Sequence, residues 1–213
     1  MEIYRFIFSP IEVNTYILAD KSGECAVIDC GCYDRDEFTE FTEFIDARKL
    51  KPVLLLNTHC HLDHVFGNRF MLEKYHLGAL SSRDDEMNRE NSVNHAMMFG
   101  LTMEEPPVPA GFLEEGQTVS FARNELMVIN VPGHSRGSLA FYSKSDGVVF
   151  TGDALFAGSI GRTDLPGGNY QTLINSIVNK LFTLPGNTVV YPGHGEKTTI
   201  KTETETNPYL NGT

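Results

Sequence analysis

The sequence is poor in cysteine, in long apolar runs and in positive charge. It has four cysteines in 213 residues, and Cys25, Cys30 and Cys32 crowd into one short region. Four cysteines in a chain of this size do not match the disulfide framework of a small secreted domain. We therefore expect buried, reduced thiols. Cys30 and Cys32 also lack the second thiol pair that a four-sulfur metal site requires.

The other two deficits argue against membranes and nucleic acids as partners. No apolar run approaches the roughly 18–20 residues of a membrane span, and Met1 and Glu2 lead straight into strand-like sequence without signal-peptide features. With 17 basic against 28 acidic residues, the formal net charge of -11 disfavours a nucleic-acid backbone as the main partner. We therefore predict a cytoplasmic protein that binds neither membrane nor nucleic acid, in an oligomeric state that the sequence leaves open.

Hydrophobic patterning indicates an α/β protein. The predicted strands are residues 3–8, 15–19, 25–29, 53–56, 126–131, 139–143, 148–150 and 189–191. The predicted helices are residues 34–50, 67–77, 83–99 and 170–182, the first opened by Asp34 and Glu37 as a capping box. Residues 101–116 are interpreted as a surface connector, residues 158–169 as a glycine-rich loop, and Asn14 and Tyr16 as part of an N-terminal meander. Because each half carries strands and helices, we predict two packed mixed sheets with helices on their outer faces, a four-layer αββα sandwich.

Potential metal ligands follow four of the apolar segments. Five histidines and two aspartates take these positions: His59, His61, Asp63, His64, His134, Asp153 and His194. In an extended segment His59 and His61 point to the same side, so both imidazoles can reach one ion, and a turn would deliver Asp63 and His64 to a second. The Asp153 carboxylate can offer one oxygen to each cation. Imidazole and carboxylate ligands predict two divalent ions, zinc first, with iron or manganese as alternatives.

These motifs resemble the metallo-β-lactamase superfamily and, within it, the glyoxalase II-like hydrolases. Residues 58–64 match the His-x-His-x-Asp-His signature, Asp29 matches the early aspartate that supports the metal loop, and residues 152–164 and 198–210 are similar to short bacterial members. The resemblance covers essentially the whole chain, so residues 1–213 are expected to form a single metallo-β-lactamase-like hydrolase domain. Arg136 and Ser138 depart from the proline and second histidine of many members.

The resemblance implies a role for each ligand. The first metal takes His59, His61 and His134, the second takes Asp63, His64 and His194, and Asp153 bridges them. Asp63 is the candidate to orient the attacking hydroxide and handle its proton. Asp29 and Thr58 are candidates to orient the ligands, with ordinary turn hydrogen bonding as the alternative.

The predicted activity is hydrolysis of a small thioester, such as an S-2-hydroxyacyl thiol, by a hydroxide that bridges two metals. The main alternative is a mono-iron persulfide dioxygenase of the same superfamily, which uses chiefly the His59, His61, His134 and Asp153 positions. A third hypothesis is a metal-binding or scaffold module without catalytic activity. The thiol carrier is left open, because the 19 residues after His194 do not match the added helical domain with which full-length glyoxalase II enzymes hold glutathione.

Substrate contacts are predicted for two arginines that lie close in sequence to ligands. Arg136 and Arg162 could each receive a substrate carboxylate, although a structural pair between Arg162 and Asp164 is an equal contender. His95, with the apolar residues at 97–99, either lines the substrate mouth or packs the helix.

Overall fold

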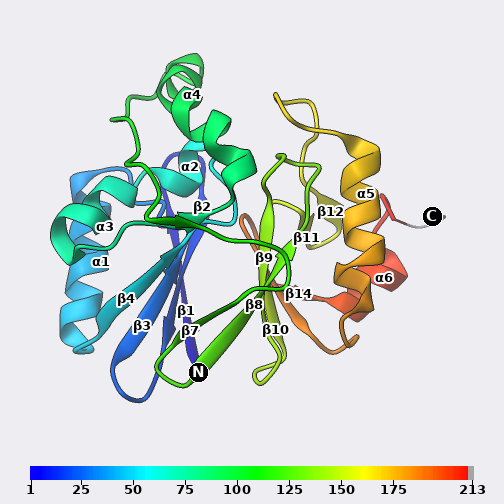
Figure 1. Ribbon diagram of the computed structural model, residues 1–213, viewed down its shortest axis with the longest axis horizontal. Helices are drawn as coiled ribbons and strands as arrows, with labels where there is room; N and C mark the ends of the chain where they lie inside the picture. Colours follow the sequence, from blue (N-terminus) through cyan, green and yellow to red (C-terminus); the bar gives the residue numbers. More distant parts are fainter. Residues whose placement is uncertain (211–213) are drawn as a thin grey trace.

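The computed structural model describes residues 1–210 and contains two mixed β-sheets with helices outside them (Figure 1). The strands are β1 (Glu2–Phe8), β2 (Val13–Ala19), β3 (Glu24–Ile28), β4 (Lys51–Leu56), β5 (Leu80–Ser81), β6 (Gly111–Phe112), β7 (Thr118–Phe121), β8 (Asn124–Asn130), β9 (Leu139–Ser143), β10 (Val148–Gly152), β11 (Leu155–Phe156), β12 (Ser159–Ile160), β13 (Val189–Pro192) and β14 (Thr198–Thr199). The helices are α1 (Arg35–Ala47), α2 (Leu62–Val65), α3 (Asn68–Tyr75), α4 (Glu86–Met98), α5 (Tyr170–Asn179) and α6 (Ile200–Thr206), with short 3-10 helices η1 (Arg83–Asp85) and η2 (Leu181–Thr183). None of these helices is long and apolar enough to cross a membrane.

The two large sheets have matching organisation. The first has the order β1-β2-β3-β4-β5-β6, and the second has the order β14-β13-β10-β9-β8-β7. The first is antiparallel from β1 to β3 and parallel from β3 to β6. In the second, β10 and β13 are parallel and the other pairs are antiparallel. Helices α1 and α3 cover the outer face of the first sheet, and α5 and α6 cover that of the second (Figure 1). The predicted four-layer sandwich is therefore confirmed.

Alternation along the strands explains the four layers. In β2, Tyr16 and Leu18 belong to the core between the two sheets, whereas Ile17 and Ala19 belong to the core beneath the helices. Successive side chains of a strand point to opposite faces, so a strand that is apolar at every position must be covered on both sides. The second sheet does the same, with Phe141 facing the central core and Tyr142 facing the core under α5.

Several short elements differ from the prediction. The expected connector at residues 101–116 includes β6, which extends the edge of the first sheet through pairing with β5. Strand β7 was not predicted, and neither were β14 and α6 in the C-terminal segment. Elements of two to four residues are too short to show a period of their own, and pairing with a neighbouring strand decides them.

The predicted capping box at α1 forms in a modified way. Asp34 Oδ1 accepts hydrogen bonds from Asp36 N and Glu37 N, both at 3.0 Å, as an N-cap should. Glu37 does not bond back to Asp34; its carboxylate accepts from Tyr33 N at 2.7 Å and Ser9 N at 2.6 Å. The glutamate thus joins the helix start to the turn after β1.

Side chains of β2 join the two sheets at the end where the predicted ligands lie. Asn14 Nδ2 and the Tyr16 hydroxyl donate to the carbonyl of Pro192 at 2.9 and 2.7 Å, and Asn14 N donates to Gly193 O at 2.7 Å. The assignment of Asn14 and Tyr16 to the meander alone was therefore incomplete. They hold the loop before His194 against the first sheet.

Candidate metal centre

The seven predicted ligands come together at one end of the sandwich. His59 and His61 lie in the loop after β4, while Asp63 and His64 lie on the short helix α2 that follows it. The remaining three, His134, Asp153 and His194, follow β8, β10 and β13 of the second sheet. Since the two sheets pack face to face, loops at the same end of both converge. The structure forms three groups whose ligand atoms lie within 4.8 Å of one another: His59, His61 and His134; His59, His64 and Asp153; and Asp63, His64 and His194.

The first ligand group consists of His59, His61 and His134. His134 Nε2 lies 3.1 Å from His59 Nε2 and 2.8 Å from His61 Nδ1. Atoms that share a zinc ion at about 2.1 Å in a tetrahedron lie roughly 3.4 Å apart, which is close to this spacing. Burial lowers the pKa of His59 well below its ordinary value and that of His61 to about 3, with neighbouring histidines adding to the effect. Neutral rings with convergent nitrogens are the form in which histidine binds a cation.

The second ligand group consists of Asp63, His64 and His194. Asp63 Oδ2 lies 3.1 Å from His194 Nε2 and 3.5 Å from His64 Nε2. Asp153 lies between the groups: its Oδ1 is 3.3 Å from His64 Nε2. Its Oδ2 is 3.5 Å from His134 Nε2 of the first group and 3.6 Å from His194 Nε2 of the second. One carboxylate therefore faces both groups, as a bridging ligand must.

Two buried polar atoms at this point have no hydrogen-bond partner within residues 1–210: His64 Nε2 and Asp153 Oδ1. A buried polar atom without a partner costs about 1–3 kcal/mol, so folded proteins leave few of them. A divalent cation between the imidazole and the carboxylate satisfies both atoms. The donor set of imidazoles and carboxylates, and these two orphaned atoms, therefore fit a pair of divalent metal ions.

The charge balance of the second group also favours a cation. Burial by itself lowers the pKa of His64, but the carboxylates of Asp63, Asp153 and Asp29 outweigh burial and raise it well above the ordinary value. For Asp153 burial raises the pKa, and the effect of His64 and the other histidines outweighs it, so the carboxyl pKa falls below its usual range. The carboxylates thus attract positive charge to this position, which a metal ion supplies when it takes the place of a proton.

Asp29 and Thr58 hold one histidine from each side of the centre. Asp29 Oδ2 accepts from His64 Nδ1 at 2.9 Å and from Thr58 Oγ1 at 2.7 Å, and Oδ1 accepts from Thr58 N at 2.8 Å. The same Thr58 hydroxyl lies 3.1 Å from His59 Nδ1, where it can accept that ring's N–H. These bonds fix the tautomers that leave Nε2 of His59 and of His64 free to bind a cation.

Backbone carbonyls orient two further histidines. His134 Nδ1 lies 2.8 Å from the Arg162 carbonyl, and His194 Nδ1 lies 3.1 Å from the Glu12 carbonyl. In each case the ring N–H donates outward and Nε2 remains directed at the centre. Neither carbonyl was predicted, and the sequence holds no signal for them because every residue has a carbonyl.

Gly193 allows the closest approach at the centre. A Cβ at this position would lie 2.1 Å from Asp153 Oδ1 and 2.8 Å from the Cε1 of His64. Any side chain would therefore push Asp153 out of its place between the groups. Glycine is therefore needed at position 193, between Pro192 and His194, for close packing against Asp153.

Five of the seven ligands line the floor of a cavity of about 690 Å³ with mostly apolar walls: His61, Asp63, His134, Asp153 and His194. The walls include Ile11, Leu62, Met98, Phe99, Phe156, Leu165 and Pro166, together with His95 and Arg162. His95 and the end of α4 therefore do line the mouth, whereas Met97 lies outside this lining and is exposed. A substrate that reaches the ligands must pass mostly apolar side chains.

The two predicted substrate arginines lie in different places. Arg162 lines the cavity, but its Nε and Nη2 donate to the two carboxylate oxygens of Asp164 at 2.7 and 2.8 Å. Arg136 is exposed and lies beside Gly167, outside the described lining of the cavity. All four cysteines are buried and unpaired, and none belongs to the ligand groups.

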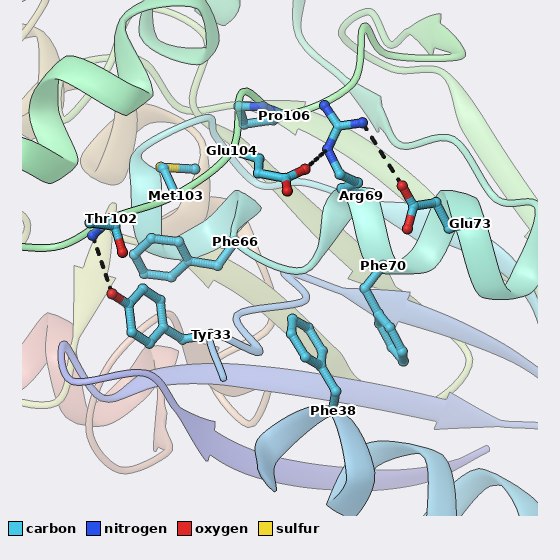
Figure 2. A pocket seen from close by; sticks show the side chains of 10 residues that line it. All are labelled: Tyr33, Phe38, Phe66, Arg69, Phe70, Glu73, Thr102, Met103, Glu104 and Pro106. Atoms are coloured by element: carbon cyan, nitrogen blue, oxygen red, sulfur yellow. Dashed lines mark hydrogen bonds and ion pairs between the residues drawn. The ribbon is translucent and has the colours of Figure 1, made fainter. Parts of the chain in front are cut away.

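A second cavity, of about 650 Å³, lies away from the ligands and is shown in Figure 2. Its walls include Tyr33, Phe38, Phe66 and Phe70, and an ion pair of 2.7 Å joins Arg69 Nε to Glu104 at its rim (Figure 2). It contains none of the seven ligands. The first cavity, which five of the ligands line, is therefore the candidate site.

Comparison with known proteins agrees with this geometry. Residues 9–194 match the family model described as the metallo-beta-lactamase superfamily, and the chain belongs to that superfamily. It is 37% identical to the probable metallo-hydrolase YqgX of Bacillus subtilis, over 100% of this chain and 99% of the relative. It is 36% identical to the hydroxyacylglutathione hydrolase GloC of Haemophilus influenzae, over 99% of both chains.

Solved structures of similar proteins share the whole fold. The B3 metallo-beta-lactamase BLEG-1 matches with a TM-score of 0.92 and 30% identity, over 99% of this chain and 100% of that one. TTHA1623 in a di-iron-bound form matches with a TM-score of 0.88 and 36% identity, over 97% and 100% of the two chains. The protein is thus a metal-dependent enzyme of the metallo-hydrolase type.

Proposed function

We propose that the protein is a dinuclear metal-dependent hydrolase that cleaves a small thioester of the S-2-hydroxyacyl thiol type. The observation that carries this proposal is the pair of three-ligand groups that share Asp153 at the floor of an apolar cavity. The name of the GloC relative supports a thioester of this kind as substrate. Zinc is the proposed metal, and iron or manganese would suit the same ligands.

The two ligand groups would hold two divalent cations, which would lower the pKa of a bound water and polarise the substrate carbonyl. The Asp63 carboxylate, buried beside His194 and His64, is placed to orient the attacking water and to accept its proton. The apolar side chains of Met98, Phe99 and Phe156 are placed to contact the organic part of the substrate, which would displace water from them on binding. No serine or cysteine nucleophile is required.

Elemental analysis followed by a substrate panel tests the proposal. Purified protein is expected to hold two zinc-like ions per chain, and metal-replete protein is expected to hydrolyse an S-lactoyl thioester. Chelation should remove the activity and the added metal should restore it. The panel includes glutathione and other thiols as carriers, and a β-lactam because BLEG-1 is a β-lactamase. Absence of turnover of every thioester by the metal-replete protein would overturn the proposal.

A mono-iron persulfide dioxygenase is the second candidate. The first ligand group, with Asp153 beside it, supplies the positions that such an enzyme uses, and TTHA1623 binds iron in this fold. One iron per chain, together with oxygen consumption on a persulfide and no thioester hydrolysis, would favour this candidate over the hydrolase.

We predict that Arg162→Ala will leave the metal centre intact. The Arg162 group that holds His134 is its carbonyl, which alanine keeps, and its guanidinium is already paired with Asp164 near the surface. Exposed ion pairs contribute only about 0–1 kcal/mol. We expect unchanged metal content and kcat, and a change in KM of at most about fivefold. Loss of metal from the variant would contradict this assignment.

A further inference from the structure

Asp85 is a fully buried carboxylate that the sequence pattern did not single out. It is the last residue of η1 and the N-cap of α4, but its side chain does not cap the helix by accepting from the backbone N–H groups of the first turn. Aspartate at a helix start ordinarily accepts from the free N–H groups of the first turn. Here the carboxylate points into the interior instead, so its hydrogen bonds serve another part of the molecule.

Its two oxygens accept from both loops that supply the first ligand group. Oδ2 accepts from Cys60 N at 2.6 Å, and Cys60 lies between His59 and His61. Oδ1 accepts from Gly137 N at 2.9 Å, in the loop that begins at His134. Asn88 Nδ2 also donates to Oδ1, at 3.2 Å. One carboxylate therefore spans the two backbone segments that must meet to place three imidazoles around one cation.

Gly137 provides independent support for this contact. A Cβ at Gly137 would lie 2.7 Å from Asp85 N, 2.8 Å from Asp85 Cβ and 2.8 Å from Ser82 Cβ. The loop after His134 therefore approaches Asp85 more closely than any residue with a side chain would allow. This approach brings Gly137 N within hydrogen-bond distance of the carboxylate.

We propose that Asp85 is a positioning residue for the first metal position. By fixing Cys60 and Gly137 relative to each other, it sets the spacing between His59, His61 and His134. None of its hydrogen bonds reaches a ligand side chain or the second ligand group, so its loss should affect one metal position selectively. The inference depends on the proposed dinuclear centre.

The test is titration of the metal-free protein with Co²⁺, whose visible absorption reports the geometry of its ligands. Groups that orient metal ligands typically contribute about 10–100-fold in metal affinity. Asp85→Asn places an amide NH₂ against one of the backbone N–H groups that now donate to the carboxylate. We expect the Co²⁺ affinity of one of the two sites to fall about 10–100-fold, and its visible spectrum to change. The other site should stay within about threefold of the unmodified protein.

Glu203→Gln is the matched control. Glu203 is 1% exposed and accepts from Gly158 N at 2.9 Å, Thr198 Oγ1 at 2.6 Å and Asn207 Nδ2 at 2.8 Å. It therefore has the same kind of buried, multiply bonded carboxylate, but none of these partners belongs to the two loops that supply the first ligand group. We expect its Co²⁺ affinities and spectrum to equal those of the unmodified protein.

Three results would overturn the inference. If Asp85→Asn has the Co²⁺ affinities and spectrum of the unmodified protein, Asp85 has no positioning role, although the dinuclear centre is still supported. If both sites weaken equally, the effect of the substitution is a general structural one. Failure of the unmodified protein to bind Co²⁺ would end the proposed centre itself. If Asp85→Asn does not fold, as judged by circular dichroism, Gly137→Ala tests the same contact from the other side. It should weaken the same site, and an unchanged spectrum would refute the role.

Discussion

Replacing Asp153 with alanine is expected to reduce hydrolysis by at least about 1000-fold and to lower the metal content from two ions to one or none. The Asp153 carboxylate faces both ligand groups, at 3.3 Å from His64 and 3.5 Å from His134. Its removal would leave cations held mainly by neutral imidazoles, without the negative charge that lies between them. Stabilisation of transition-state charge by bound metal is worth several kcal/mol, and each 1.4 kcal/mol is a factor of ten.

Metal content and turnover of the same preparation measure this effect. Asp146→Asn is the control, because Asp146 lies at the opposite end of β10 and pairs with the N-terminal amine at 2.6 Å. That variant should keep both ions and full activity. Asp153→Asn, which keeps one carboxamide oxygen, should retain more metal than the alanine variant. Normal activity in Asp153→Ala would show that the ligand groups are not the source of hydrolysis.

The second large effect is expected for Asp29→Asn. Asp29 is 2% exposed and accepts three hydrogen bonds, from Thr58 N, Thr58 Oγ1 and His64 Nδ1. An amide can accept through one oxygen only, so its NH₂ must face a donor. Unsatisfied buried donors cost about 1–3 kcal/mol, and loss of a ligand-orienting group costs about 10–100-fold in metal affinity. We expect Asp29→Asn to lose both stability and metal affinity by these amounts.

The backbone makes asparagine the informative substitution here. Asp29 has φ of 52°, a left-handed conformation that asparagine tolerates better than most residues. A loss in Asp29→Asn therefore reports the hydrogen bonds rather than backbone strain. Denaturant unfolding of the metal-free protein measures the stability effect, and competition with a chromophoric chelator measures metal affinity.

Asp20→Asn controls for the loss of a buried aspartate. Asp20 lies before β3 and Asp29 directly after it, at the other end of the strand, and Asp20 accepts from Ser22 N, Asn124 Nδ2 and Arg123 Nε. We expect Asp20→Asn to alter stability while leaving metal affinity unchanged. Equal metal affinities in the two variants would mean that Asp29 does not orient the ligands.

Much of the fold follows from local patterns. The long strands and the helices α1 and α5 agree with the prediction within a few residues, because their apolar positions repeat over enough residues to define a period. Strands β6 and β14, with two residues each, exist only because an adjacent strand pairs with them. A segment of two residues is too short to show a hydrophobic period in the sequence.

The metal ligands could be predicted from the sequence, but the groups that orient them could be predicted only in part. A single histidine or aspartate after a strand can be an ordinary turn residue. Five histidines and two aspartates after four apolar segments together indicated a metal site. The carbonyls of Arg162 and Glu12, which orient His134 and His194, are chemically identical to every other carbonyl. Only packing selects them.

The sequence by itself determined which atoms can bind metal and that each follows a strand, because residue type and hydrophobic period are local properties. The tertiary structure decided which of those atoms share a cation, and which way each imidazole faces. It also made Asp85, an ordinary aspartate at a helix start in the sequence, the residue that joins two ligand loops. Distances between segments 52 residues apart, such as Asp85 and Gly137, depend on how the two sheets pack, and no local pattern encodes that packing.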